Sequence, residues 1–196
     1  RRWRRAAPLV LSMSVSMAMA AGLSAPAIAA EPGVLVLGVQ LEPPVLDPTS
    51  NPAAVISELL QGNLYEGLVR FDAAGEPQPC LAERWAVSAD GLTYTFSLRH
   101  GVSFHDGSAF DSQSAKFTLE RALAPGSLNP HRARLTAVRS IEAPDPHTLV
   151  LHLSRRSGSL LQSLAWTAFA MLSPGSAADN ALHPVGTGPF KFAGWR

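Results

Sequence analysis

Hydrophobic and polar residues alternate most regularly near the middle of the chain. The side chains that share one face of an extended backbone there are Leu92, Tyr94, Phe96 and Leu98. Alternation with a period of two predicts a β-strand with one buried face. Burying four such side chains contributes roughly 1.5–3 kcal/mol each. The total is comparable with the net stability of a domain, so we expect the local core to form on this face.

A second alternating stretch covers residues 141–153. It begins with Ile141, continues through an Asp-Pro pair and ends with leucines at every second position. Proline presets the backbone angle that a tight turn needs, and the alternation that follows is typical of a strand. These residues therefore predict a β-hairpin.

The run VLVLGVQ at residues 34–40 is different because its apolar residues are almost continuous. A strand that is buried on both faces of a parallel or mixed sheet has this composition. We therefore expect a buried strand at this position.

Three segments carry helix signals. Pro52 precedes residues 53–68, and proline is well tolerated in the first turn of a helix. Asp111 is a good N-cap for residues 112–123. Residues 159–172 form a third helical segment. Helices that alternate with strands and hairpins predict a mixed fold of the α/β or α+β class.

The first 29 residues have the composition of a secretory signal peptide. A basic start, RRWRR, precedes an uncharged apolar stretch from Ala6 to Ala21, and small residues at Ala27 and Ala29 suit a signal peptidase. The apolar stretch is short for a membrane span. We expect cleavage near Ala29 and export; the alternative is a membrane anchor that is retained.

Charge and cysteine content restrict the classes of function that the chain could have. The formal net charge is +1, and removal of the four arginines in the first five residues would make the mature chain mildly acidic. This balance argues against a nucleic-acid-binding surface. Cys80 is the only cysteine, so no disulfide can form within the chain. We expect Cys80 to be a buried, unreactive thiol.

His105 and Asp106 are the most conspicuous pair of candidate catalytic or metal-binding residues. Asp-Gly after an alternating strand is a strong turn signal, because glycine accepts a positive φ and aspartate can bond the backbone beyond it. A metal site would need further ligands at workable spacing. We therefore expect a structural turn here, with catalysis or metal binding as the alternative.

No other motif assembles a catalytic site. Gly186–Pro189 lacks the third glycine and the Lys-Ser/Thr pair of a phosphate-binding loop. The scattered serines include no G-x-S-x-G motif. We expect no catalytic residues, no metal site and no cofactor, which favours a binding protein over an enzyme.

Seven short runs occur in a characteristic order: LDP (46–48), NLYEGLVRFD (63–72), PCLAERW (79–85), SADGLTYTFSLRHGVSFHDGSAF (88–110), FTLERAL (117–123), IEAPDPHTLVLHL (141–153) and GTGPF (186–190). In this order the chain resembles the family 5 extracellular solute-binding proteins of ABC transporters. The resemblance covers nearly all of the chain after the signal segment.

The resemblance implies an incomplete fold of the periplasmic binding protein type 2 kind. It would contain part of lobe I and an extra small α+β domain, with the second lobe absent and the chain truncated. The expected division is a signal peptide at 1–29, the first strand segment of lobe I at 30–49, the extra small domain at 50–155 and a return to lobe I at 156–196.

The function implied by the resemblance is that of the periplasmic substrate-binding component of an ABC importer. Such a protein captures peptides or similar small solutes and delivers them to permease subunits in the inner membrane. We expect a monomer that binds no nucleic acid. Two alternatives stay open: an exported hydrolase whose catalytic residues lie in a missing C-terminal part, and a receptor module that senses a solute.

The resemblance also implies that residues 48–54 and 165–172 could face the ligand. The expected ligand-binding residues are Asn51, Trp166 and Phe169; the alternative for each is loop polarity or core packing. The nickel-complex branch of the family places an arginine near the position of Ala170, so alanine there argues against metal uptake.

Overall fold

The computed structural model describes residues 33–195, and the chain divides into two compact units, Arg1–Val39 and Gln40–Arg196. The predicted signal peptide at 1–29 lies outside the described residues. Residues 33–39 contain no helix or strand, and the side chain of Leu35 is 80% exposed. The prediction of a buried strand at 34–40 is therefore wrong. A buried strand needs paired neighbours, and no described strand pairs with this run.

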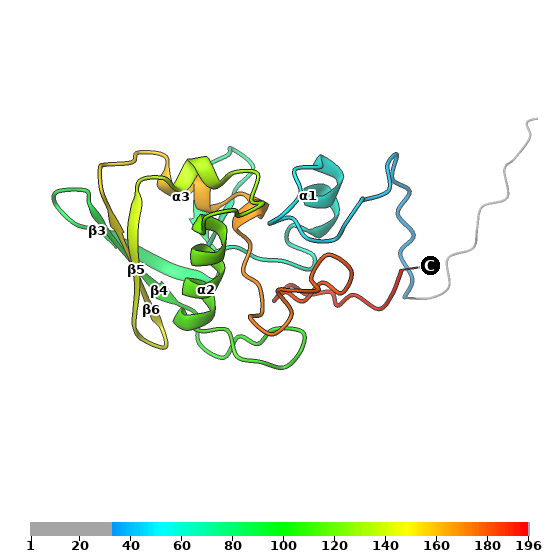
Figure 1. Cartoon of the computed structure of the whole chain (residues 1–196). Helices are drawn as coiled ribbons and strands as arrows, with labels where there is room; N and C mark the ends of the chain where they lie inside the picture. The colour runs from blue at the N-terminus through cyan, green and yellow to red at the C-terminus, as the bar shows by residue number, and fades with distance from the viewer. Residues whose placement is uncertain (1–32, 196) are drawn as a thin grey trace, which may run out of the picture. The chain divides into compact units, whose positions relative to one another are not determined.

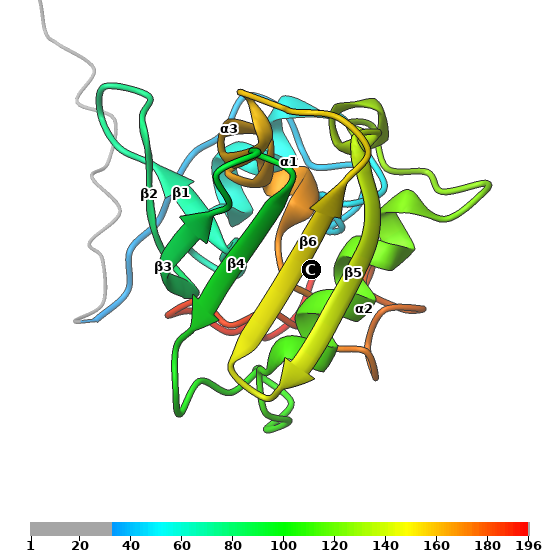
Figure 2. The same ribbon diagram turned by 90° about the vertical axis from the view of Figure 1, so that its left-hand side faces the viewer.

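The centre of the larger unit is a four-stranded antiparallel sheet (Figure 1). Its strands, in spatial order, are β3 (Ala82–Val87), β4 (Thr93–Leu98), β6 (Thr148–Leu153) and β5 (Val138–Asp145). Figure 2 shows this sheet nearest to the viewer, with the helices behind it. The helices therefore cover one face of the sheet and leave the other open.

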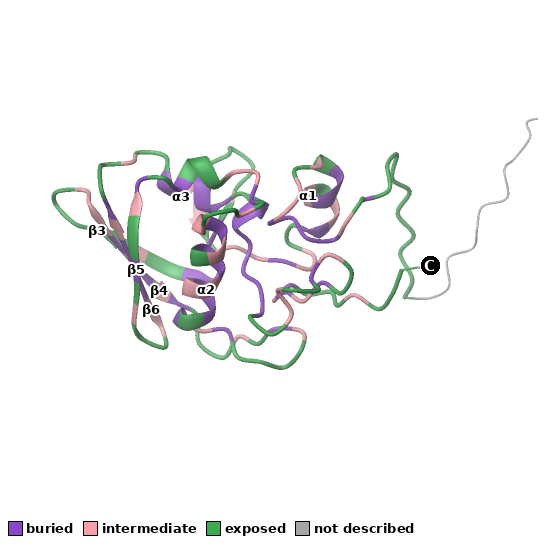
Figure 3. Ribbon diagram, viewed as in Figure 1, coloured by how far each residue is buried: buried purple, intermediate pink, exposed green. Residues whose placement is uncertain are grey.

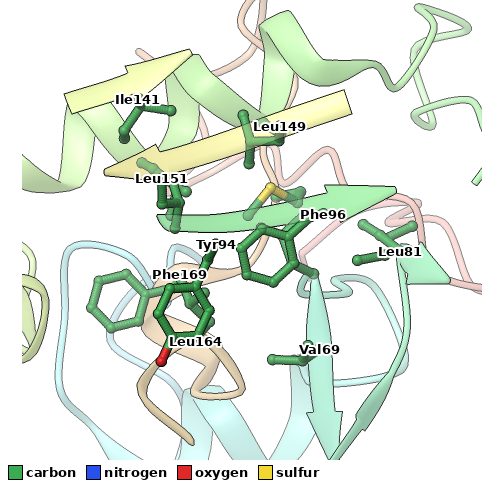
Figure 4. Close-up of a cluster of buried hydrophobic side chains, with 14 of the residues drawn as sticks. Val69, Leu81, Tyr94, Phe96, Ile141, Leu149, Leu151, Leu164 and Phe169 are labelled. Carbon is green, nitrogen blue, oxygen red and sulfur yellow. The ribbon is translucent and has the colours of Figure 1, made fainter. Parts of the chain in front are cut away.

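The two predicted strands with period-two alternation, β4 and β6, pair in the centre of the sheet. Phe96 lies opposite Leu149, and Tyr94 lies opposite Leu151. All four side chains are buried, whereas the alternate residues of both strands are half-buried. The predictions of a strand and of a hairpin at 141–153 are confirmed, and the buried face of both strands forms the main core (Figure 4).

Helix α2 (Ser112–Leu123) packs against β5 and β6 and buries Ala115 and Leu119. Its start is fixed by a capping box: the Asp111 carboxylate accepts a hydrogen bond from the Ser114 N–H at 2.8 Å, and the Ser114 hydroxyl oxygen accepts one from the Asp111 N–H. These bonds satisfy N–H groups that have no partner within the helix. The predicted helix and its N-cap are confirmed.

A small hairpin and a short helix extend the main core. The hairpin consists of β1 (Val69–Phe71) and β2 (Pro77–Pro79), and the helix is α3 (Leu160–Leu164). Figure 4 shows Val69 and Leu164 among the buried side chains of the sheet. The core therefore joins residues from both sides of the boundary predicted near residue 155.

A second, smaller core surrounds helix α1 (Ala54–Leu60), where Leu46, Tyr65 and Leu172 are buried with it. The predicted helix at 53–68 is too long. The helix ends at Leu60 in a tight turn, in which the N–H groups of Leu64 and Tyr65 both donate to the Leu60 carbonyl. Helix formation stops where the chain turns back on itself.

The third predicted helix, residues 159–172, is interrupted. It contains α3 and a single 3₁₀ turn, η2 (Thr167–Phe169), and a similar turn, η1 (Arg132–Leu135), precedes β5. Residues 170–195 contain no helix or strand, but Figure 3 shows buried stretches within them. Burial without regular structure means that these residues are held by side-chain packing and by individual hydrogen bonds.

Candidate functional site

His105 and Asp106 form the predicted turn. The Asp106 carboxylate accepts hydrogen bonds from the Ser108 N–H at 2.9 Å and from its hydroxyl at 2.6 Å, and Gly107 adopts a positive φ of 86°. The second oxygen of the Asp106 carboxylate accepts a hydrogen bond from the Ser173 hydroxyl. The carboxylate is thus occupied by structural hydrogen bonds.

The imidazole of His105 holds a distant segment of the chain. Its Nδ1 accepts a hydrogen bond from the Gly186 N–H at 3.3 Å, and its Nε2 lies 2.8 Å from the Gly188 carbonyl. The first bond requires an unprotonated Nδ1, so the hydrogen is on Nε2, which donates to Gly188. Both ring nitrogens therefore bond the backbone, a role that the sequence pattern did not indicate.

The two glycines of the GTGPF run are required by close packing. A Cβ at Gly186 would overlap the Leu64 carbonyl, and a Cβ at Gly188 would overlap the Asn63 carbonyl. The Gly188 N–H donates to Leu64 O at 2.9 Å. The glycines thus let two backbone segments run side by side, and Thr187 between them donates to Glu66 Oε2.

Cys80 is buried and free, as predicted. Burial, together with the neighbouring Glu66 carboxylate, raises the pKa of the thiol to about 11. The thiol also contacts Glu66 Oε1 at 3.7 Å. Because the thiolate is the reactive form of cysteine, this environment keeps Cys80 unreactive.

The three predicted ligand-binding residues lie in different environments. Phe169 is fully buried in the main core, and Asn51 is half-buried, with its side-chain oxygen accepting from the Ala53 N–H. Trp166 is 41% exposed. Of the three, Trp166 offers the largest accessible surface to a solute. Ala170, at the position compared with the nickel-complex branch, is buried in the smaller core.

Trp166 is the centre of a group that we call the Trp166 cluster, consisting of Phe71, His131, Arg134 and Trp166. The Phe71 ring meets the indole edge-on at a centroid distance of 6.2 Å, and the His131 ring lies at 5.0 Å. The guanidinium carbon of Arg134 lies 4.8 Å from the indole centroid. Aromatic contact and cation–π attraction therefore order three side chains on a partly exposed surface.

The electrostatics of the Trp166 cluster are dominated by Arg134. Its Nε donates to His131 Nδ1 at 3.5 Å, and no described acidic side chain lies within salt-bridge distance. Burial, and then the positive charge of Arg134, lower the pKa of His131. Because Nδ1 accepts from Arg134, the neutral ring of His131 carries its hydrogen on Nε2.

The sequence pattern indicated Trp166 but neither His131 nor Arg134. The only available signal was the short basic run HRAR at 131–134, which precedes the predicted hairpin. A run of this kind is ordinarily a solvated surface turn. Only the tertiary structure brings it against Trp166.

Two negative findings concern residues 33–195. No group of three or more His, Cys, Asp or Glu side chains among them is arranged to hold a metal ion. Within the same range, no helix is long and apolar enough to cross a membrane.

Comparison with known families identifies one match. Residues 76–196 match the family described as bacterial extracellular solute-binding proteins, family 5 Middle.

Among proteins of known name, the chain is 35% identical over 188 residues to the glutathione-binding protein GsiB of Salmonella paratyphi A. It is 34% identical over 199 residues to the glutathione-binding protein GsiB of Pectobacterium atrosepticum. These alignments cover 92% and 100% of this chain, but each covers only 36% of the relative. The chain therefore spans about a third of the length of these relatives.

Solved structures show the same fold. The PBP AgaA from A. tumefacien R10, in complex with agropinic acid, superposes with a TM-score of 0.73 at 36% identity. The periplasmic binding protein DppA from Helicobacter pylori, in complex with the peptide STSA, superposes with a TM-score of 0.68 at 30% identity. The matched regions cover 79% and 78% of this chain and 32% and 35% of the two structures.

Proposed function

Because the chain belongs to the family 5 bacterial extracellular solute-binding proteins, we propose that it is part of the substrate-binding component of an ABC importer. The observation that carries the proposal is similarity over almost the whole chain: 92% of this chain aligns with a glutathione-binding protein at 35% identity. The incomplete type 2 periplasmic binding protein fold expected from the sequence is confirmed, since the structural relatives are matched over about a third of their length.

The proposed solute is a peptide or a similar small molecule that carries a carboxylate. Of the relatives named above, GsiB is named as a glutathione-binding protein, and AgaA and DppA were solved in complex with agropinic acid and with a peptide. A peptide has a terminal carboxylate, and agropinic acid is named as an acid. The shared chemistry is therefore a compact polar molecule with at least one anionic group.

The proposed mechanism is closure of two lobes around the solute. A solute that contacts both lobes stabilises the closed form, whereas a solute with equal affinity for both forms shifts nothing. Micromolar binding supplies about 8 kcal/mol in total. Contacts from this chain alone would provide only part of that free energy.

We propose residues 50–155 as the extra small domain, with 30–49 and 156–196 in lobe I. All four strands of the main sheet and α2 fall within 50–155. The core also receives Leu164 and Phe169 from beyond residue 155. The small domain would consequently need residues of lobe I to complete its core.

The proposed location is the periplasm, reached through the predicted signal peptide at 1–29, and the proposed partners are permease subunits in the inner membrane. We further propose that the protein acts as a monomer, without catalytic activity. Supporting this role, His105, Asp106 and Cys80 all make structural hydrogen bonds.

The test uses the product of the complete gene and a panel of glutathione, a tetrapeptide with a free carboxylate, and maltose. Calorimetry should show micromolar binding of glutathione or the tetrapeptide but not of maltose, and deletion of the gene should abolish uptake of the bound solute by cells. Cleavage of the bound solute would favour an exported hydrolase. Normal uptake combined with a lost transcriptional response to the solute would favour a receptor module.

A further inference from the structure

Two histidine side chains stack on each other at one end of the main sheet. His100 follows β4, and His147 lies in the turn between β5 and β6. Their ring centroids are 3.6 Å apart, with an angle of 34° between the ring planes. Figure 2 shows the β5–β6 turn at the end of the sheet opposite to α3. The pair is therefore separate from the Trp166 cluster, whose tryptophan comes just after α3.

Backbone hydrogen bonds hold both histidines in place. The Leu98 N–H donates to the His147 carbonyl at 2.8 Å, which ties the end of β4 to the β5–β6 turn. At the start of α2, the Ser112 N–H donates to the Pro146 carbonyl at 2.9 Å. The two imidazoles are thus carried by rigid elements, which is what a precise binding site requires.

The imidazole of His147 lacks the partners that other histidines of the chain have. His105 bonds the backbone through both ring nitrogens, and His152 and His183 each contact a carboxylate. By contrast, the Nδ1 of His147 is buried and has no hydrogen-bond partner among residues 33–195. A buried polar atom without a partner costs free energy, so a ligand that pairs with this ring would be stabilising.

The spacing and charge of this pair suit a metal ion. Neutral imidazole is a ligand for Zn²⁺, Ni²⁺ and Cu²⁺. Because the metal–nitrogen distance is about 2.0–2.1 Å, two nitrogens on one ion lie roughly 3 Å apart. The centroid distance of 3.6 Å is close to this value, and the ring of His100 is exposed and free to tilt. The Asp145 carboxylate, which accepts from the His147 N–H at 2.8 Å, adds a negative charge that favours a cation.

We propose that His100 and His147 bind a divalent transition-metal ion through one nitrogen of each ring. Two side chains are fewer than an enclosed metal centre uses, so water would complete the coordination and the ion would exchange readily. The inference goes beyond the proposed transport function and does not depend on it. It departs from the expectation of no metal site because the two histidines are far apart in the sequence, and only the pairing of β4 with β6 brings them together.

The experiment measures Cu²⁺ binding to the product of the complete gene, without a polyhistidine tag, by calorimetry. Cu²⁺ binds imidazole more tightly than other divalent ions do, and Mg²⁺, which prefers oxygen ligands, is the control ion. His100→Gln and His147→Gln should each weaken Cu²⁺ binding about tenfold or more. His152→Gln is the matched control, because it removes another imidazole of the same sheet, one that contacts Glu142. It should bind Cu²⁺ as the wild type does.

A spectroscopic measurement separates coordination from a change in folding. Electron paramagnetic resonance of the bound Cu²⁺ should show two nitrogen ligands in the wild type and one in His100→Gln, whose circular dichroism should be unchanged. Wild-type affinity in both variants of the pair, or an equal loss in His152→Gln, would overturn the inference. So would Cu²⁺ binding no tighter than that of Mg²⁺. Each of these results would reduce the stacked rings to a packing contact and would leave the proposed transport function untouched.

Discussion

His105 and Gly188 are joined by a hydrogen bond across 83 residues of the chain, with the imidazole Nε2 lying 2.8 Å from the carbonyl oxygen. The backbone N–H of His105 also donates to the Gly186 carbonyl at 2.9 Å, and the Gly186 N–H donates to the imidazole Nδ1. One residue thus makes three hydrogen bonds to a segment without secondary structure. These bonds fix the course of that segment over the body of the molecule.

Replacing His105 with alanine should therefore destabilise the protein. The substitution removes both imidazole hydrogen bonds and leaves the backbone groups of Gly186 and Gly188 to find other partners. We expect a loss of about 1–3 kcal/mol in the free energy of unfolding, measured by urea denaturation. His183→Gln is the control, because the hydrogen bond of His183 with Asp179 is exposed. A loss in the control as large as in His105→Ala would contradict this account.

Gly188→Ala should destabilise the protein through steric overlap. The new methyl group would meet the Asn63 carbonyl, which belongs to the backbone and cannot swing aside. Gly194→Ala provides a matched control, since a Cβ there has nothing within 4 Å. We expect a lower unfolding midpoint in urea for Gly188→Ala only. Equal midpoints for the two variants would mean that the segment can shift away at little cost.

The parts of the fold that the sequence predicted are those whose signals are local. Strands β4 and β6 alternate with a period of two. Helix α2 follows a capping aspartate. These signals act within a few residues, so they survive in almost any tertiary context. The strand predicted at 34–40 failed for the opposite reason: a buried strand depends on its neighbours, and its own composition does not supply them.

The contacts of the candidate site could not be predicted in this way. His105 and Gly188 are far apart in the sequence, and so are Arg134 and Trp166, and neither pair belongs to a periodic pattern. The His105–Asp106 turn was predicted correctly because Asp-Gly is a local signal. The role of the imidazole, which depends on where the GTGPF run passes, was not.

Asp111→Ala should weaken helix α2 at its first turn. The substitution leaves the Ser114 N–H without the carboxylate acceptor that it now has at 2.8 Å. Removing an N-cap of this type costs about 1 kcal/mol, whereas asparagine caps almost as well as aspartate. We therefore expect Asp111→Ala to lower the free energy of unfolding, measured by urea denaturation, by about 1 kcal/mol and Asp111→Asn to lower it much less. Equal losses would show that charge, and not capping, is what matters.

Arg121 and Asp47 form an ion pair that is asymmetric in exposure. The Asp47 side chain is 3% exposed and that of Arg121 is 33% exposed, with Nη2 and Oδ2 3.3 Å apart. Arg121→Met leaves a buried carboxylate without its cation, although the Thr49 hydroxyl still donates to it. We expect Arg121→Met to lower the free energy of unfolding, measured by urea denaturation, by about 1–3 kcal/mol. Adding Asp47→Leu to Arg121→Met should recover part of this loss, and no recovery would indicate that Asp47 has a separate role.

Asp106 should make the stability of the protein depend on pH in the acid range. Burial acts to raise the pKa of this carboxyl, but hydrogen bonds from Ser108 and Ser173 outweigh it and hold the pKa below its ordinary value. A carboxyl with a lowered folded-state pKa stabilises the protein above its unfolded-state pKa, which is about 3.9. That contribution is lost as the pH falls through the lower, folded-state value. The effect should stay below about 1 kcal/mol because Asp106 is exposed and water screens it.

The measurement compares urea unfolding of the wild type with that of Asp106→Asn from pH 7 down to pH 2.5. Other carboxyls with lowered pKa values, such as Asp72, Asp90 and Asp145, titrate in both proteins, so their contributions cancel in the difference. We expect the difference in unfolding free energy to be constant above about pH 5 and to shrink below about pH 4. A difference that did not change with pH would mean that the hydrogen bonds of this turn do not require the charged carboxylate.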